Sequence, residues 1–171
     1  MSLEIERKFS IIRYPLDELK NGDLKLISTT HIEQAYLAYN NIEQVRIRKK
    51  TIFDDNNKKE SFYQTYKKST CEGLGLVRDE MEYEISSNIY SQLRSLDCRV
   101  PIRKTRTRMT GGGYTYDLDE YEQFNLIIAE VEFESIEEMR LFVQPAWLGD
   151  EISHNSQLTN KYLWKKLNGL T

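Results

Sequence analysis

Apolar and polar residues alternate with a period of two through eight separate stretches of this 171-residue chain. Successive side chains of an extended strand point to opposite faces of a sheet, so this alternation predicts strands with one apolar and one polar face. The eight stretches are residues 2–9, 32–39, 42–50, 60–68, 76–86, 99–108, 113–121 and 126–134. Because eight antiparallel strands can close into a barrel, we expect an α+β fold built on an eight-stranded antiparallel tunnel.

Fewer segments have the pattern of a helix. Ser135 and Glu138 form a capping box, which predicts a helix over residues 136–143. Further helices are expected at residues 15–20, 87–96 and 155–167. The polar stretch 54–59 predicts a loop between the third and fourth strands. Since the chain contains no repeat and no linker, we expect residues 1–171 to form one domain.

The polar faces of the strands carry an unusual number of charges. Charged residues make up 30% of the chain, above the usual share of about 25%. Carboxylates and cations occur as separate doublets that share one strand face. The carboxylate doublets are Glu4 with Glu6, Glu80 with Glu82 and Glu130 with Glu132, and the cation doublets are Arg46 with Arg48 and Lys104 with Arg106.

A solvated outer face is the ordinary explanation for a polar strand face. Exposed strand positions nevertheless disfavour Glu and Asp, and neighbouring like charges repel unless something lies between them. A divalent cation between carboxylates and a phosphate chain between cations would remove that repulsion. The doublets therefore favour a tunnel with a charged interior, whose outer apolar faces are covered by helices.

The overall composition disfavours several classes of protein. Lys and Arg number 24 against 27 Asp and Glu, a net charge of −3, which disfavours a protein that coats nucleic acid. The chain has no apolar run of about 18 residues, so we expect no membrane span. Cys71 and Cys98 suggest a reducing, cytoplasmic setting, and with His31 and His154 they match no zinc-ligand spacing.

Short motifs follow one another along the predicted strands. They are Glu4-Ile5-Glu6-Arg7-Lys8, Gln34-Ala35-Tyr36-Leu37, Val45-Arg46-Ile47-Arg48, Thr65-Tyr66-Lys67, Arg78 with Glu80, Glu82 and Ile85, Lys104 with Arg106, Asp119 with Tyr121, Ala129-Glu130-Val131-Glu132, and Trp147-Leu148-Gly149 with Glu151-Ile152. In this order they resemble the CYTH domain, or triphosphate tunnel metalloenzyme, family and its bacterial inorganic triphosphatase-like branch. One departure is Tyr116, where the family usually carries Trp.

The resemblance implies an eight-stranded tunnel that binds a triphosphate together with Mg²⁺ or Mn²⁺. It implies phosphate contacts from six cations: Lys8, Arg46, Arg48, Lys67, Lys104 and Arg106. It implies four metal carboxylates: Glu4, Glu6, Glu130 and Glu132. Catalytic roles would fall to Lys8, Glu80, Glu82 and Asp119, of which the carboxylates would hold a second metal or orient the attacking water.

Several activities remain open at this point. Inorganic triphosphate is favoured because the segments at 34–37 and 45–48 resemble the bacterial triphosphatases. A class IV-type adenylyl cyclase and a nucleoside or thiamine triphosphatase of the same family are alternatives. Trp147 and Trp164 lie outside the charged strands and are interpreted as packing residues, not as a platform for thiamine. A polyphosphate-binding module is the non-enzymatic alternative, although surplus carboxylates would weaken simple anion binding. A homodimer is one assembly that the sequence leaves open.

Overall fold

The computed structural model describes residues 2–54, 57–69 and 77–171, without the side chains of residues 2–4, 54, 69, 77 and 78. The elements run in the order β1 (Ser2–Ile11), α1 (Leu16–Asn21), β2 (Lys25–Tyr39), β3 (Glu43–Asp54), β4 (Asn57–Ser69), β5 (Val77–Ile85), α2 (Ser87–Ser95), β6 (Ile102–Gly111), β7 (Tyr114–Tyr121), β8 (Leu126–Phe133), α3 (Ile136–Leu141), β9 (Leu148–Glu151), the 3-10 turn η1 (Ser156–Leu158) and α4 (Asn160–Leu167). The side chains of Glu4 and Arg78, and all of Cys71, therefore lie outside the described residues.

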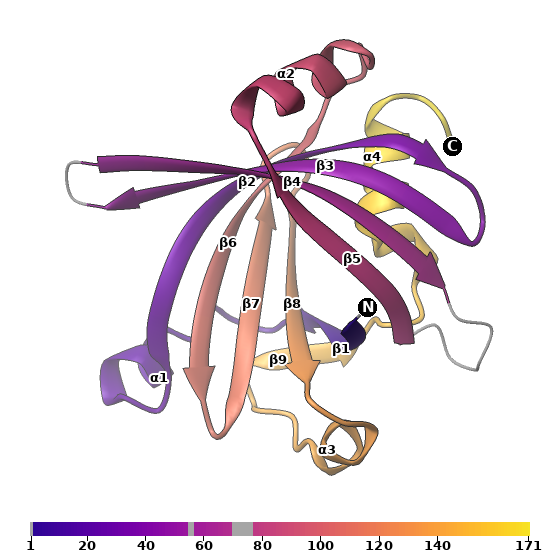
Figure 1. Cartoon of the computed structure of the whole chain (residues 1–171). Helices are drawn as coiled ribbons and strands as arrows, with labels where there is room; N and C mark the ends of the chain where they lie inside the picture. Colours follow the sequence, from indigo (N-terminus) through magenta and orange to yellow (C-terminus); the bar gives the residue numbers. More distant parts are fainter. Residues whose placement is uncertain (1, 55–56, 70–76) are drawn as a thin grey trace.

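The strands form one antiparallel sheet in the order β5-β4-β3-β2-β6-β7-β8-β1-β9. The first residues of β1 also pair with β5, from Ser2 opposite Glu80 to Ile5 opposite Val77. This pairing joins the two ends of the order, so that strands β1 to β8 surround a common interior (Figure 1). The expected eight-stranded antiparallel tunnel is confirmed, and β9 is a short ninth strand beside β1.

Three details of the strand prediction were incomplete or wrong. Strand β2 begins at Lys25 instead of residue 32, because its first half pairs with β6 although it lacks apolar alternation. The limits of the expected polar loop 54–59 are wrong, since Lys58 and Lys59 belong to β4 and pair with Phe53 and Ile52. Hydrogen bonds of the β3–β4 ladder outweigh the low strand preference of these residues. Residues 55 and 56 of that loop lie outside the described residues. Strand β9 was not expected at all.

The helix predictions hold with shorter limits. The Ser135 hydroxyl accepts a hydrogen bond from the Glu138 amide at 3.0 Å, which confirms the cap of α3, but the helix ends at Leu141. The predicted helix 155–167 is divided into η1 and α4. Thr159 interrupts it because its backbone is extended and its hydroxyl caps α4 by accepting from the Tyr162 amide at 3.2 Å. Among the described residues no helix is long and apolar enough to cross a membrane.

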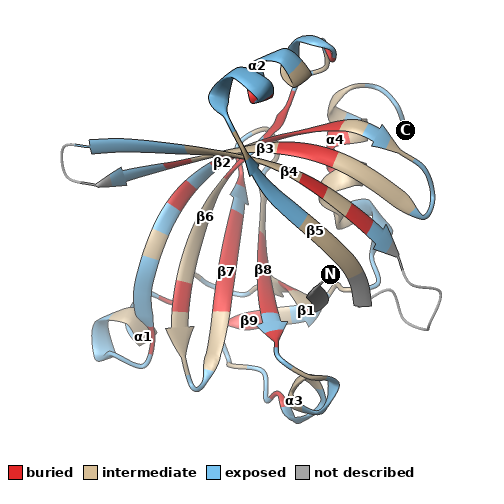
Figure 2. Cartoon of the chain, viewed as in Figure 1, coloured by how far each residue is buried: buried red, intermediate tan, exposed pale blue. Residues whose placement is uncertain are grey.

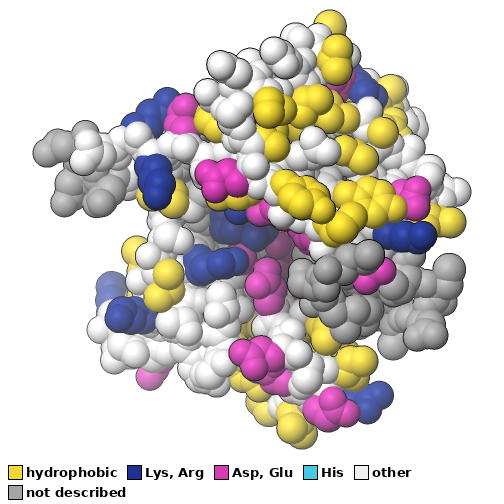
Figure 3. All heavy atoms as spheres, viewed as in Figure 1, with side chains coloured by type: hydrophobic (Ala, Val, Ile, Leu, Met, Phe, Trp, Pro, Cys, Tyr) yellow, Lys and Arg dark blue, Asp and Glu magenta, His cyan; other side chains and the backbone are white. Residues whose placement is uncertain are grey.

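Burial is strongest along the neighbouring strands β7 and β8. Figure 2 shows long buried stretches on both strands, whereas α2 is mostly exposed. The interior enclosed by the strands is hollow, and Figure 3 shows Lys, Arg, Asp and Glu side chains gathered where the molecule opens. Polar strand faces thus point inward, as the charge doublets predicted.

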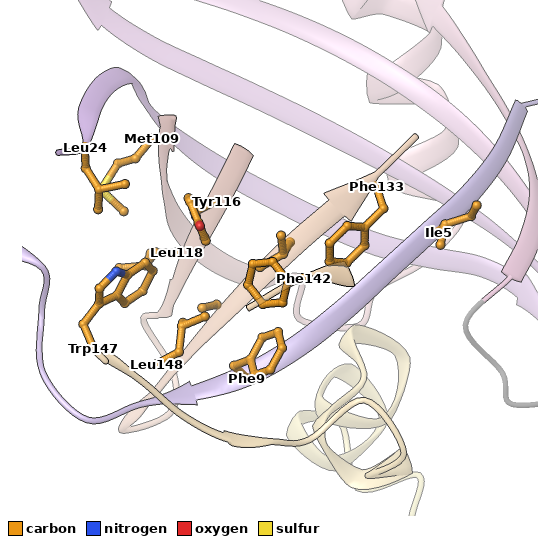
Figure 4. Close-up of a cluster of buried hydrophobic side chains, with 12 residues drawn as sticks. Ile5, Phe9, Leu24, Met109, Tyr116, Leu118, Phe133, Phe142, Trp147 and Leu148 are labelled. Atoms are coloured by element: carbon orange, nitrogen blue, oxygen red, sulfur yellow. The ribbon is translucent and has the colours of Figure 1, made fainter. Parts of the chain in front are cut away.

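Apolar clusters pack on both sides of the strand ring. The largest lies outside it and joins the outer side chains of β1, β7 and β8 to the segment after α3, including Phe9, Phe142 and Trp147 (Figure 4). A second lies on the inner strand face, because Ile102 shares its face with Lys104, and it packs against Leu163 and Trp164 of α4. Helix α2 covers a third cluster. Both tryptophans are packing residues, as expected, and an irregular segment covers much of the sheet in addition to the helices.

Candidate functional site

A cavity of about 790 Å³ occupies the interior of the strand ring. Most of the predicted site residues line it: Glu6, Lys8, Arg46, Arg48, Lys67, Glu80, Glu82, Lys104, Arg106, Glu130 and Glu132. Asp119 is completely buried and lies behind the wall, in contact with Lys104 and Arg106. The side chain of Glu4 is outside the described residues. The period-two pattern therefore brings residues from six strands to one site.

Strands β1 and β8 bring acidic and basic residues together at one wall of the cavity. Their antiparallel register places Glu6 opposite Glu132 and Lys8 opposite Glu130. The Lys8 ammonium forms ion pairs with Glu130 and, at 3.2 Å, with Glu6. Burial disfavours the charge on Lys8, but these two carboxylates outweigh it and raise the pKa of Lys8 above its usual value. Lys8 therefore stays protonated at neutral pH.

Glu132 differs from its neighbours because it forms no ion pair or hydrogen bond with the described part of the chain. Burial and the charge of Asp117 raise the pKa of Glu132 above the usual carboxylate value. Glu130 shows the opposite behaviour, since Lys8 and Arg106 hold its pKa well below the usual value in spite of burial. The carboxylates thus include Glu130, which is paired with cations, and Glu132, whose more distant arginines do not offset burial and the charge of Asp117.

Strands β3, β4 and β5 form a second wall. Arg46 and Lys67 both contact Glu80, at 3.2 and 2.6 Å. Glu82 forms an ion pair with Arg48 and accepts a hydrogen bond from the Thr65 hydroxyl at 2.9 Å. Although partial burial opposes ionisation of Glu82, Arg48 and Lys50 lower its pKa to about 2.

Strands β6 and β7 supply the third wall, where Lys104 and Arg106 share Asp119. Asp119 lies opposite Arg106 in the strand register and accepts from its Nε and Nη2 atoms at 2.6 Å each. Lys104 is only 3% exposed. Burial and the charge of Arg106 lower the pKa of Lys104 to about 8, even though Asp119 is in contact with it.

Three cations on these walls are not fully compensated by the neighbouring carboxylates. Burial and the charge of a neighbouring arginine lower the pKa of Arg48, of Lys50 and of Lys104. The buried Nε atom of Arg48 has no hydrogen-bond partner among the described residues. Buried donors are normally satisfied, so this arrangement favours an anionic ligand with several acceptor oxygens.

Comparison with known proteins agrees with this geometry. Residues 2–162 match the model of the CYTH domain. The chain belongs to the CYTH domain family. It is 30% identical over 168 residues to an inorganic triphosphatase of Acetivibrio thermocellus, covering 96% of this chain and 95% of that protein. It is 28% identical over 165 residues to an inorganic triphosphatase of Nitrosomonas europaea, covering 94% and 95%.

The CYTH fold is also found by comparison with solved structures. A crystal structure of an inorganic triphosphatase superposes with a TM-score of 0.61 at 24% identity. The match covers 100% of this chain and 97% of that one. At this level of identity the likeness shows the fold.

Sequence reasoning missed several residues of the CYTH cavity. Lys50 and Arg108 line it, and the buried Asp117 lies behind it in contact with Arg106 and Arg108. The signal was present for these three, because each continues the inward alternation of a strand that already carried predicted site residues. Helix α4 and the β2–β3 turn also contribute to the lining, for example through Tyr162 and Asn41, and no strand pattern could have indicated them.

The motif at residues 34–37 has a structural explanation in this cavity. Gln34 and Tyr36 are both buried and point inward, and the Gln34 amide donates to the Tyr36 hydroxyl at 2.8 Å. Tyr36 lines the cavity and packs against Trp164 of α4, with ring centroids 5.2 Å apart. This pair connects the cavity wall to the helix that lies over it.

The carboxylates of the CYTH cavity fit a hard divalent cation by their chemistry. Glu6 and Glu132 are cross-strand neighbours, and the Glu132 side chain forms no ion pair with the described residues. Carboxylate oxygens are the ligands that Mg²⁺ prefers. No group of three His, Cys, Asp or Glu side chains converges in the parts of the chain that are described, where the side chain of Glu4 is missing.

Proposed function

We propose that this protein hydrolyses inorganic triphosphate to pyrophosphate and phosphate in the cavity, with Mg²⁺ or Mn²⁺ bound. The observation that carries this proposal is that the cavity walls hold both cations and a carboxylate whose charges are not compensated. Burial and a neighbouring arginine lower the pKa of Arg48 and of Lys104, whereas burial and Asp117 raise the pKa of Glu132. A polyanion with a divalent cation would relieve both effects at once.

The cations would bind the substrate from opposite walls. Arg46, Arg48 and Lys67 extend from β3 and β4, and they face the cavity together with Lys8, Lys104 and Arg106. Charge-assisted hydrogen bonds to phosphate oxygens are among the stronger polar interactions in proteins. Phosphoryl transfer depends mainly on positioning and on stabilisation of developing charge, and an array of fixed cations supplies both.

The metal would be held by Glu6 and Glu132, with Glu4 and Glu130 as further ligands. When bound, it would neutralise phosphate charge and increase the acidity of a water molecule. Glu130 is already in contact with Lys8 and Arg106. We therefore expect Glu130 to keep these two cations in place as well as to contribute an oxygen.

The remaining predicted catalytic residues would act through charge. Lys8 stays protonated beside Glu6 and Glu130, so it would stabilise a phosphoryl group rather than remove a proton. Glu82, with its pKa lowered to about 2 by Arg48 and Lys50 against the effect of burial, is a weak base. Glu80, Glu82 and Asp119 would therefore hold the phosphate-binding cations and orient water, and no covalent nucleophile is required.

The names of the two sequence relatives favour inorganic triphosphate over ATP or thiamine triphosphate. The test compares tripolyphosphate, ATP and thiamine triphosphate side by side with each metal, with products resolved by phosphorus NMR and cyclic AMP measured separately. Pyrophosphate and phosphate from tripolyphosphate at the highest rate is the expected result. Formation of cyclic AMP would identify the protein as a cyclase. Preferential cleavage of thiamine triphosphate would identify that compound as the substrate, and tight binding without turnover would identify a binding module.

A further inference from the structure

We propose that Arg108 is a further phosphate-binding residue of the cavity, in addition to Arg106, and that Asp117 orients it. This inference rests on the proposed function, because it assigns an additional residue to the same substrate. The two arginines lie on the same face of β6, and both line the cavity.

Most of the hydrogen-bonding capacity of Arg106 is already used. Its Nε and Nη2 atoms donate to the two oxygens of Asp119, and its Nη1 atom donates to Asp117 at 2.8 Å. The Nη2 atom also donates to Glu130. Since a guanidinium carries five N–H donors, only one of them has no partner among the described residues. Arg106 therefore fixes three carboxylates in place and keeps one donor for a phosphate oxygen.

Most of the hydrogen-bonding capacity of Arg108 is unused. Its Nε and Nη2 atoms donate to Asp117 at 2.7 and 2.6 Å. Three of its five donors, including both on Nη1, have no partner in the described part of the chain. Its side chain is 39% exposed against 15% for Arg106, although both face the same cavity. Arg108 can therefore offer a nearly complete donor edge to a ligand.

Asp117 determines the direction of that donor edge. It lies opposite Arg108 in the β6–β7 register and is only 1% exposed. One of its oxygens accepts from both Arg106 and Arg108, and the other accepts from Arg108 alone. A carboxylate that binds a guanidinium through two donors fixes its plane, so Asp117 leaves the Nη1 side of Arg108 directed away from β7.

The position of Arg108 indicates which end of the substrate it would bind. Arg108 lies two residues beyond Arg106, roughly 7 Å farther along the strand. At this end it lies within electrostatic range of Glu132, one of the carboxylates that we propose for the metal. The phosphate group that Arg108 binds is therefore the one at the Glu132 end of the cavity.

The test is calorimetric binding of tripolyphosphate, at fixed salt and with Ca²⁺ to limit turnover, to wild type and to Arg108→Ala. Arg103→Ala is the matched control. It removes the same charge from β6, but Arg103 pairs with Glu33 on the outside of the sheet. We expect Arg108→Ala to weaken binding by about 10- to 150-fold and Arg103→Ala by less than about 5-fold. Equal losses in both variants would overturn the inference, because they would show only general electrostatics.

Two further variants separate orientation from charge. Arg108→Lys keeps the charge but loses the planar donor edge, so we expect it to recover less than half of the lost binding free energy. Asp117→Asn should weaken binding in wild type but much less in the Arg108→Ala background. An equal effect of Asp117→Asn in both backgrounds would show that Asp117 acts on overall structure instead of on Arg108.

The same series distinguishes this inference from the proposed function. If wild type fails to bind tripolyphosphate, the proposed function fails and the inference fails with it. If wild type binds and Arg48→Ala weakens binding while Arg108→Ala does not, only the assignment of Arg108 is wrong. The expected result is that both variants weaken binding.

Discussion

Glu6 of β1 and Glu132 of β8 are directly paired across the antiparallel ladder, and both side chains line the charged cavity. Two like charges in such a pair destabilise a sheet unless a counter-ion lies between them. Glu6 is close to Lys8, at 3.2 Å, whereas Glu132 has no ion pair with the described residues. This pair is therefore the part of the cavity with the greatest need for a cation.

We expect Glu132→Gln to leave the melting temperature unchanged or raised when no divalent metal is present, because the substitution removes a repelled charge. The same variant should lose most of the rise in melting temperature that Mg²⁺ or Mn²⁺ produces in wild type. Thermal unfolding with and without each metal measures both effects. Glu120→Gln, an exposed position on β7 outside the cavity lining, is the control and should keep the full response to metal. A large drop in stability of metal-free Glu132→Gln would contradict this account.

The cations of β3 should contribute directly to substrate affinity. Arg46→Ala and Arg48→Ala should each weaken tripolyphosphate binding by about 10- to 150-fold, since each removes charge-assisted hydrogen bonds. Lys58→Ala is the control, because Lys58 is 55% exposed and pairs with Glu60 on β4. Exposed pairs contribute roughly 0–1 kcal/mol, so binding to this variant should stay close to that of wild type. Comparable losses of binding affinity in all three variants would show that the effect arises from net charge and not from specific contacts.

The inward position of these cations could be predicted from the sequence, because alternation fixes which side chains share a strand face. Arg46, Arg48 and Lys67 lie where the pattern placed them, and so do Lys104 and Glu130. Their contacts could not be predicted, because the choice of carboxylate for each cation depends on strand register. Asp117, for example, is recognisable as a partner of Arg108 only once the β6–β7 pairing is known.

Other parts of the fold gave no local signal. Strand β9 has only four residues, and its pairing with β1 depends on the path of the segment after α3. The first half of β2 contains Ser28, Thr29 and Thr30, which do not alternate, yet it is stabilised by its pairing with β6. In both cases pairing with a strand distant in the sequence determines the structure, and the alternation of apolar and polar residues cannot predict that pairing.

The lowered pKa of Lys104 predicts a specific pH dependence. Its pKa in the folded protein is about 8, against 10.5 for the unperturbed group, so the unfolded chain binds more protons between these values. The contribution of Lys104 to stability should therefore rise with pH across this window. Bound phosphate favours the charged form, so binding of tripolyphosphate should take up a proton above pH 8 and weaken as the pH rises.

Calorimetry in two buffers of different ionisation enthalpy measures this proton uptake. Lys104→Arg is the matching variant, because arginine stays charged throughout the range. We expect proton uptake near pH 9 in wild type and much less in Lys104→Arg. Equal uptake in the two proteins would show that another group titrates on binding.

Helix α4 should be required for an intact cavity. Trp164 is completely buried and packs against Tyr36, which lines the cavity, and against Tyr39. Trp164→Ala should lower the free energy of unfolding by about 3–5 kcal/mol and should also weaken tripolyphosphate binding. Urea unfolding measures the first effect, with Leu141→Ala, 75% exposed, as a control of small expected effect. Full binding affinity in a destabilised Trp164→Ala protein would show that α4 does not shape the site.

The most direct test of the central claim is the release of phosphate from tripolyphosphate by the wild-type protein, with Mg²⁺ or Mn²⁺ and with excess chelator. The account predicts pyrophosphate and phosphate in equal amounts when metal is present, and loss of the activity when the metal is removed. It also predicts that Arg48→Ala and Glu132→Gln are strongly impaired under the same conditions, while Lys58→Ala is not. Undiminished hydrolysis in chelator, or no hydrolysis by wild type with either metal, would contradict it.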